Sequence, residues 1–133
     1  MWRLEQSPPH ELPDLGRFLA ALNAHGDFFD RGAPVAVGRA PGRLDLMGGI
    51  ADYSGALVLE LPLAAAAYVA VQEVDEPLVT MRSTGAQEIG AAPEVRLPLE
   101  ALAPPGEPLA YAAARALLAA NPRGAWAAYV AGV

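Results

Sequence analysis

The sequence predicts an α+β fold, in which strands come first and helices follow. Val35–Leu61 carries apolar, strand-like runs on both sides of a glycine-rich centre, and Leu78–Ser83 places Val79 and Met81 on one face of a further strand. Leu109–Ala120 instead carries apolar residues at helical spacing. Strand patterns followed by helical patterns are typical of α+β domains. We therefore expect a sheet with helices packed on it.

The composition indicates a folded protein without a membrane span. The chain has 133 residues, of which 53% are hydrophobic, so it can form a core and disorder is not expected. No run reaches the roughly 18 apolar residues of a membrane helix, and the N-terminus lacks the apolar stretch of a signal peptide. Cysteine is absent, which excludes disulfides and thiolate metal sites. We expect a cytoplasmic protein.

The charge pattern argues against several partners and cofactor motifs. The net charge is -6 and all basic residues are arginines, which disfavours nucleic acid and anionic membranes as partners. A Walker-type phosphate loop requires lysine and is therefore impossible here. His10 and His25 have no partners at metal-ligand spacing. We expect no metal site within this chain.

Residues 1–33 are expected to form an N-terminal arm and a helix. Three prolines oppose regular structure in residues 1–13, so this arm is expected to be poorly ordered. Asp14 can cap the helix that follows, and Gly26 can end it. The apolar face of this helix would hold Leu15, Phe18, Leu19 and Leu22.

The glycine-rich region Val35–Leu61 is expected to run as strand, turn, strand, turn, strand. Glycine loses more backbone entropy on ordering than any other residue, so five glycines here suggest unusual backbone conformations or close approach to a ligand. Pro62 would end the last of these strands, and Ala64–Glu73 would form another. Loops held by a rigid sheet are common places for binding residues.

The C-terminal part is expected to contain two more strands and two helices. The strands are Leu78–Ser83 and Glu94–Leu99, and the first helix begins near Pro108 and ends at Asn121-Pro122. Its inward stripe would consist of Leu109, Ala113, Ala116, Leu117 and Ala120. Ala125–Val133 would begin the second helix. That helix would present Trp126 and Tyr129 to a surface that further residues of a longer protein cover.

The run A-P-G-R-L-D-L-M-G-G-I-A-D-Y-S-G, within Val35–Leu63, resembles the first signature of the galactokinase branch of the GHMP small-molecule kinases. There the run is typically A-P-G-R-V-N-L-I-G-E-H-T-D-Y-N, and within the branch this sequence is more similar to the L-arabinokinases. The resemblance covers roughly residues 35–133. It implies that residues 34–133 are part of an N-terminal, sugar-binding domain with a fold like ribosomal protein S5 domain 2, built on a mixed sheet.

The resemblance gives roles to several polar residues. Arg43 alone would more often be a surface ion pair, but it matches the arginine that lies beside the reacting hydroxyl, where a charged, fork-shaped donor can bind substrate and stabilise the transition state. Asp52 alone would be a turn residue, but it matches the aspartate that binds sugar hydroxyls. Asp45 and Arg39 are expected to be structural. Tyr53 could line the sugar pocket or be half-buried.

Gly49-Ile50 departs from the galactokinase pattern, which has Glu-His at these positions. In the family that pair helps to hold the sugar, with the glutamate reaching the exocyclic O6 hydroxyl. Without it, the C6 hydroxyl of galactose would be left unpaired, which costs roughly 1–3 kcal/mol when the group is buried. L-Arabinopyranose has the same ring hydroxyl pattern but no C6 group. Gly49 and Ile50 are therefore expected to contribute to a pentose-binding site.

The resemblance also implies two features that are not found in residues 1–133. One is the second signature of the family, a serine-rich loop that cradles the phosphates of ATP, and the other is the later catalytic aspartate. ATP and Mg²⁺ are thus implied for a complete enzyme, with a sugar as substrate and the remainder of the kinase as partner, while this chain alone is expected to be inactive and to hold no cofactor-binding residue. Galactokinase activity and a non-catalytic, sugar-binding regulatory module remain alternatives.

Overall fold

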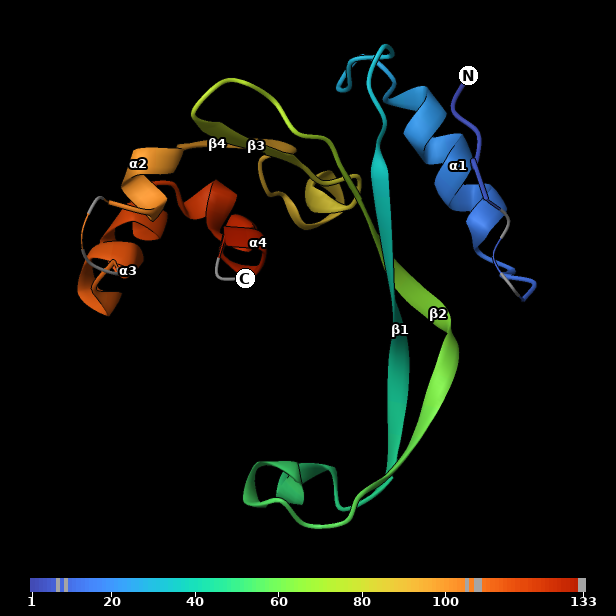
Figure 1. Cartoon of the computed structure of the whole chain (residues 1–133). Helices are drawn as coiled ribbons and strands as arrows, with labels where there is room; N and C mark the ends of the chain where they lie inside the picture. The colour runs from blue at the N-terminus through green and yellow to red at the C-terminus, as the bar shows by residue number, and fades with distance from the viewer. Residues whose placement is uncertain (7, 9, 105, 107–108, 132–133) are drawn as a thin grey trace. The chain divides into compact units, whose positions relative to one another are not determined.

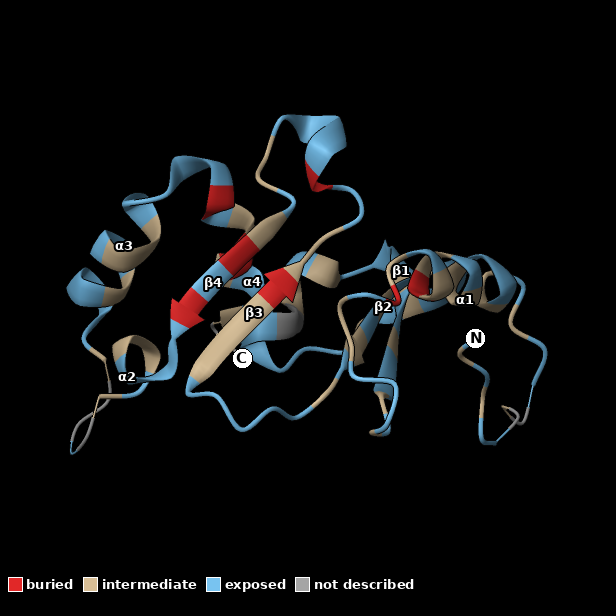
Figure 2. Cartoon of the chain, turned by 90° about the horizontal axis from the view of Figure 1, so that it is seen from above, coloured by how far each residue is buried: buried red, intermediate tan, exposed pale blue. Residues whose placement is uncertain are grey.

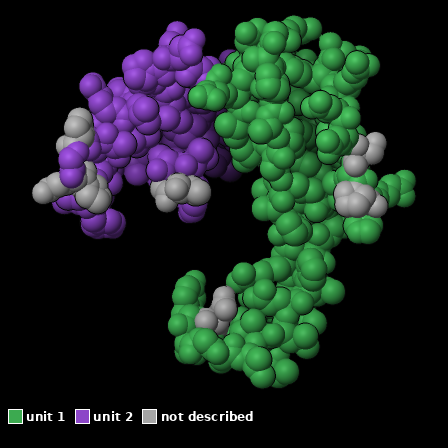
Figure 3. Space-filling model, viewed as in Figure 1, with its two compact units in different colours: residues 1–73 green, residues 74–133 purple. Residues whose placement is uncertain are grey.

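The computed structural model describes residues 1–133 except residues 7, 9, 105, 107–108 and 132–133. It contains helices and antiparallel strands, which confirms the α+β class (Figure 1). The chain divides into two compact units, residues 1–73 and residues 74–133 (Figure 3). No helix in the described part of the chain is long and apolar enough to cross a membrane.

A long antiparallel ribbon forms the centre of the first unit. Strand β1 pairs with β2 from Ala36 opposite Val71 to Met47 opposite Leu59, and a short 3-10 helix, η1, follows β1 (Figure 1). The elements of this unit are α1 (Leu15–Ala24), β1 (Ala36–Met47), η1 (Gly49–Ser54) and β2 (Leu59–Val71).

The predicted break near Asp52 is confirmed as η1 between β1 and β2, but the other predicted breaks in the ribbon were wrong. Pro41-Gly42 lies inside one continuous β1 strand, and Pro62 lies inside β2 opposite Arg43. Each strand of a two-stranded ribbon has a free edge, so a proline can be accommodated where its missing N–H is not required by the partner strand. The pairing shifts between Pro41 and Arg43 and again between Asp45 and Met47, which marks two β-bulges or irregularities rather than turns.

Helix α1 was predicted correctly, but its attachment was not. The side chain of Asp14 makes no capping hydrogen bond. Its Oδ1 accepts a hydrogen bond from Tyr68 Oη at 2.9 Å, and its Oδ2 pairs with Arg39 Nη2 at 3.2 Å. The Phe18 ring stacks on Tyr68 with a centroid separation of 4.5 Å. Asp14 therefore joins the start of α1 to both strands, and the structural role expected of Arg39 is confirmed.

The environment of Asp14 favours its charged form. Desolvation is the largest influence and by itself raises the pKa of the carboxyl, but it is outweighed by the hydrogen bonds from Tyr68 and Arg39 together with a backbone hydrogen bond and the charge of Arg39. The pKa of Asp14 is consequently lowered from its ordinary value of 3.8. The link between α1 and the ribbon is thus held by a carboxylate.

The N-terminal arm forms no helix or strand in its described residues, as expected, yet it is attached to α1. The backbone N–H of Trp2 donates to Asn23 Oδ1 at 2.6 Å, and Asn23 Nδ2 donates to the carbonyl of Leu19 at 2.8 Å. One amide side chain therefore connects the arm to the helix, and the expectation of a poorly ordered arm was wrong at Trp2.

The second unit is built on a two-stranded antiparallel sheet. β3 and β4 pair from Leu78 opposite Pro98 to Arg82 opposite Glu94, which confirms both predicted strands. The elements are β3 (Leu78–Arg82), η2 (Ala86–Ile89), β4 (Glu94–Pro98), α2 (Leu99–Leu102), α3 (Tyr111–Ala119), η3 (Pro122–Ala127) and α4 (Ala128–Ala131). The four-residue helix α2 was not predicted, because it is shorter than a detectable helical period.

Most of the buried residues belong to this second unit (Figure 2). Its core contains Met81, Val95, Leu97 and Ala127, so the face of Val79 and Met81 points inward as predicted. The stripe predicted for α3 was wrong in part. Leu117 packs against the core together with Leu118, whereas Ala113, Ala116 and Ala120 are exposed. The predicted start at Pro108 lies outside the described residues.

The predicted second C-terminal helix is divided between η3 and α4. Trp126 does not face outward as expected, because it packs against the core and its Nε1 donates to the carbonyl of Ala92 at 2.8 Å. Tyr129 is 87% exposed, in agreement with the prediction. The two aromatic residues thus have different environments, because η3 turns more tightly than the α-helix assumed for both.

Candidate functional site at the end of the ribbon

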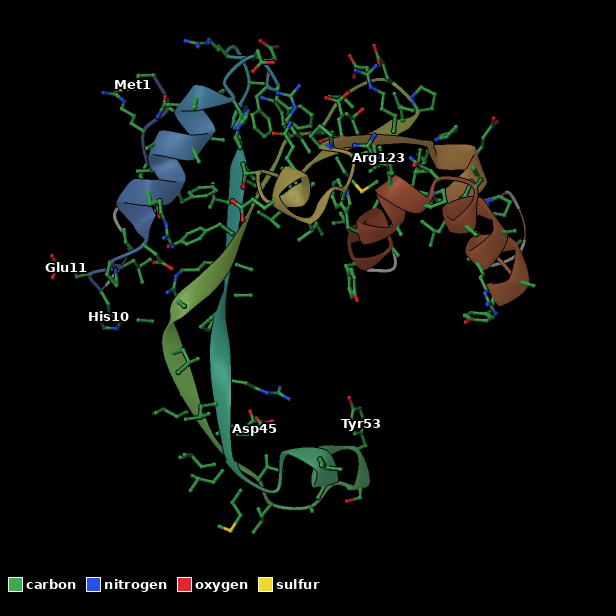
Figure 4. The ribbon with its side chains drawn as sticks, turned by 180° about the vertical axis from the view of Figure 1, so that it is seen from behind. Met1, His10, Glu11, Asp45, Tyr53 and Arg123 are labelled. Carbon is green, nitrogen blue, oxygen red and sulfur yellow. The ribbon has the colours of Figure 1, made fainter. Side chains whose placement is uncertain are left out.

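The predicted site residues gather where β1 passes into η1. Arg43 lies in β1, and the remaining predicted residues follow in η1: Gly49, Ile50, Asp52 and Tyr53. Figure 4 shows Asp45 on the ribbon and Tyr53 projecting from η1. α1 is attached to the ribbon farther along, through Arg39 and Tyr68. The signature residues therefore lie in one unit, on a strand and on the short helix that follows it.

Glycine makes the passage from strand to helix possible. Gly48 has φ of +80°, and a Cβ at this position would lie 3.2 Å from the carbonyl oxygen of Leu57. Its own carbonyl accepts a hydrogen bond from the Ala51 amide at 2.7 Å, which closes the first turn of η1. A positive φ and a close backbone approach are both conditions that favour glycine. Part of the glycine content of the signature is thus explained by this turn.

Gly49 leaves room for the side chain of Asp45. A Cβ at position 49 would lie 2.6 Å from Asp45 Cγ and 2.8 Å from Asp45 Cβ, and it would contact Oδ2 even more closely. Rotation of Asp45 would relieve the contact with Oδ2 but not that with Cβ. The side chain of Asp45 can therefore keep this position only because residue 49 is glycine. Its carboxylate fills the space that the side chain of any larger residue at position 49 would occupy.

Arg43 lies between two carboxylates. Its Nε donates a hydrogen bond to Asp45 Oδ1 at 3.2 Å and lies 3.2 Å from Glu60 Oε1 of the neighbouring strand. The side chain of Arg43 remains 55% exposed. The ion pair expected of an isolated arginine is therefore present, and it leaves half of the side chain open to solvent.

Glu60 was missed by the sequence reasoning. It lies directly opposite Asp45 in the register of the ribbon and 26% of its side chain is exposed. Cross-strand neighbours share a face of a sheet, but the pairing is visible in the sequence only when the register is known. The irregularities at Pro41/Arg43 and Asp45/Met47 hide that register.

The two apolar members of the site are open to solvent. Ile50 is 97% exposed and Tyr53 is 99% exposed, so Tyr53 is not a half-buried tyrosine. The backbone of Asp52 lies in η1, while its side chain lies outside the described residues. The hollow formed in this unit by Trp2, Leu19, Leu22 and Val35 lies elsewhere. The site is therefore an open surface in the part of the chain that the structure describes.

The residues present do not by themselves form a site for a nucleotide polyphosphate or its metal ion. Arg43, Asp45 and Glu60 together carry a formal charge of -1, so this cluster alone would not hold the phosphates of ATP. No group of three or more His, Cys, Asp or Glu residues able to hold a metal ion occurs among the described residues. The chemistry of this surface suits a neutral ligand with hydroxyl groups, because carboxylates accept and a guanidinium donates hydrogen bonds.

Comparison with known proteins identifies the signature. Residues 23–73, which include β1, η1 and β2, match the family profile described as the galactokinase galactose-binding signature. The ribbon and η1 therefore carry a galactokinase-type signature. It is 38% identical over 130 residues to L-arabinokinase of Arabidopsis thaliana, a match that covers 82% of this chain. The chain spans 12% of the length of that relative. No solved structure matches the chain significantly.

Proposed function

We propose that this chain is part of an ATP-dependent sugar 1-kinase of the L-arabinokinase type, which converts L-arabinose and ATP to β-L-arabinose 1-phosphate and ADP. The observation that carries the proposal is a galactokinase sugar-binding signature in which Gly49-Ile50 replaces the Glu-His of the galactokinase pattern. The 38% identity to an L-arabinokinase supports it. ATP, Mg²⁺ and the groups that bind them would come from other parts of the kinase.

In this proposal the end of the ribbon binds the sugar. Arg43 would lie beside the reacting hydroxyl, because its exposed half is available to donate hydrogen bonds there. Asp52 would accept hydrogen bonds from neighbouring sugar hydroxyls, and Tyr53 would cover the sugar ring with its exposed aromatic face. Arg43 would stabilise charge that develops during phosphoryl transfer, a role that positioned cations have in such reactions.

The choice between pentose and hexose would depend on position 49. Gly49 supplies no acceptor for a C6 hydroxyl, and the Asp45 carboxylate that occupies the adjacent space is paired with Arg43. A buried hydroxyl without a partner is disfavoured by roughly 1–3 kcal/mol. L-Arabinose, which lacks the C6 group, would therefore be preferred to galactose, and Ile50 would add apolar surface at the same place.

The test is the ratio of kcat/KM for L-arabinose and galactose in the intact kinase that contains this chain. Gly49→Glu adds a carboxylate for the C6 hydroxyl and should shift the ratio toward galactose by about tenfold to a hundredfold. Gly49→Ala is the matched control, because its Cβ also displaces Asp45 but adds no acceptor. A folded Gly49→Glu variant with the parent's ratio, or the same shift in both variants, would contradict the role of position 49.

The same proposal covers the fold of the domain, the place where the kinase works and the activity of this chain alone. The fold of residues 34–133 would be that of the S5 domain 2-like part of a GHMP kinase, working in the cytoplasm. The 133-residue chain alone should not consume ATP when a sugar is added, and arabinose-dependent turnover by the purified chain would contradict this. An intact protein that prefers galactose would be a galactokinase. One that binds sugar without turnover would be a regulatory module.

A further inference from the structure

Arg43, Asp45 and Glu60 form a three-residue cluster on one face of the ribbon. Asp45 and Glu60 are direct cross-strand partners, and Arg43 precedes Asp45 by two residues, which places all three on the same side of the sheet. The Nε atom of Arg43 lies 3.2 Å from Asp45 Oδ1 and 3.2 Å from Glu60 Oε1. The arginine therefore lies between the two carboxylates.

The position of Arg43 between Asp45 and Glu60 compensates the repulsion between these two carboxylates. Like charges directly opposite each other in a sheet destabilise it, and Asp45 and Glu60 form such a pair. Glu60 Oε1 is buried and accepts no hydrogen bond, since the single hydrogen on Arg43 Nε is directed to Asp45 Oδ1. The ion pair with Arg43 is the interaction that offsets the charge of Glu60 among the described residues.

The contacts use one edge of the guanidinium and leave another edge open. Both carboxylates approach Nε, and no described residue accepts a hydrogen bond from the terminal amino groups of Arg43. A guanidinium has five N–H donors in a fixed plane, so fixing Nε also fixes the direction of the remaining four. The side chain is 55% exposed, which agrees with an open outer edge.

We propose that Glu60 is a positioning residue for Arg43. Together with Asp45, it holds the Nε edge of the guanidinium against the ribbon, so that the two terminal amino groups point away from the strands toward the substrate. This role rests on the proposed function, in which Arg43 acts beside the reacting hydroxyl. Glu60 itself does not contact the sugar. Its charge holds Arg43 in one geometry and lowers the entropy that the side chain would otherwise lose when the transition state forms.

The kinetic test compares Glu60→Gln with Glu73→Gln in the intact kinase. Glu60→Gln keeps the size of the side chain but removes its charge, and Glu73 is an exposed residue just beyond the ribbon. Because Arg43 is assigned to the transition state, Glu60→Gln should lower kcat about tenfold with little change in the KM for sugar. The loss should be smaller in an Asp45→Asn background, because the two carboxylates act on the same arginine. Glu73→Gln should behave like the parent.

A spectroscopic test follows Arg43 directly in the 133-residue chain. The ¹H–¹⁵N signal of Arg43 Nε, assigned by its loss in Arg43→Lys, should exchange slowly with solvent in the parent, because its hydrogen is bonded to Asp45 Oδ1. Glu60→Gln keeps this bond but removes the second charge that holds the guanidinium against the ribbon, so exchange should become several-fold faster. Glu73→Gln should leave the exchange rate unchanged. Identical exchange rates in the parent and Glu60→Gln would overturn the contact on which the proposal depends.

The two tests separate the proposals. A parent kinase that phosphorylates sugar, with Glu60→Gln equal to Glu73→Gln in kcat, overturns the positioning role and leaves the proposed function in place. If the intact parent protein phosphorylates no sugar, the proposed function is overturned, and so is the claim that Glu60 positions Arg43 for catalysis. In that case the exchange measurement still decides whether Glu60 holds Arg43.

Discussion

The carboxylate of Asp14 connects three elements of the first unit. It accepts a hydrogen bond from Tyr68 in β2 and pairs with Arg39 in β1, while its backbone lies at the start of α1. Arg39 also donates to the carbonyl of Ala64 at 2.6 Å. A residue type that commonly caps helices is here used between elements, because two strong donors from the ribbon lie within reach.

The pH dependence of stability should report this contact. The pKa of Asp14 in the folded chain lies below its ordinary value of 3.8, so its stabilising effect is present above about pH 4 and is lost as the pH falls through the folded pKa. Asp14→Asn should therefore have a lower melting temperature than the parent at pH 7, and the difference should shrink toward pH 2. Thermal unfolding followed by circular dichroism measures both.

Asp75→Asn is the control for this prediction, because Asp75 is exposed in the segment between β2 and β3. Its melting temperature should follow that of the parent at every pH. A difference between parent and Asp14→Asn that stays constant from pH 7 to pH 2 would show that the ionised carboxylate does not hold α1 to the ribbon.

At the scale of single residues, the sequence indicated which residues are candidates for the site, but it did not indicate which residues contact them. The signature run indicated Arg43 as a candidate, and the structure places it within β1, at an irregularity of the ribbon rather than at a turn. Glu60 could not be found in the same way, since it lies 17 positions from Arg43 and meets it only through the strand register. The contact between Gly49 and Asp45 likewise depends on the shape of the turn, which a pattern of residue types does not encode.

At the scale of elements, the 3-10 helix η3 packs against β4 through a glycine. A Cβ at Gly124 would lie 2.8 Å from Val95 Cγ2 and 2.5 Å from Asn121 Nδ2. Val95 belongs to the core of the second unit, and Asn121 accepts a hydrogen bond from the Gly124 amide at 3.1 Å. A methyl group at this position would push η3 away from the sheet and disturb its N-terminal cap.

Gly124→Ala should therefore destabilise the second unit. Overpacking of this kind typically costs about 1–3 kcal/mol, which should appear as a lower free energy of unfolding in urea. Gly85→Ala is the matched control, because a Cβ at Gly85 would meet nothing within 4 Å. Equal unfolding free energies for the parent and Gly124→Ala would mean that η3 is not held closely against Val95.

The strands of the second unit were predictable, whereas the ribbon of the first was predicted in pieces. Met81 is buried between less buried neighbours, and Val79, two residues earlier, packs against the same core, so both lie on the predicted face of β3. In the ribbon, Pro62 was interpreted as a strand end and a turn was expected near Arg43, although β2 continues past Pro62 and β1 continues past Pro41 and Arg43. Proline marks the end of a strand reliably only when both neighbouring strands require its N–H, and here each strand has one partner.

At the scale of the whole chain, much apolar surface remains exposed on the ribbon. Leu44 lies opposite Leu61 and Met47 lies opposite Leu59, so these four side chains share the face that Arg43 does not occupy. Their exposed fractions are 49%, 50%, 67% and 53% in that order. Two-stranded ribbons are marginally stable alone in water, and contiguous exposed apolar surface promotes association.

The purified 133-residue chain should consequently self-associate as its concentration rises. Leu61→Lys places a charge in the middle of this apolar face and should shift the chain toward monomer, because burying an unpaired charge in an interface is costly.

Ile89→Lys is the matched control. It adds the same charge at a residue of η2 that is 76% exposed, outside the ribbon, and should leave association unchanged. Sedimentation velocity over a concentration series measures the effect. Association that both variants reduce equally would reflect net charge alone, and a parent that stays monomeric throughout would contradict the prediction that the ribbon face requires a cover.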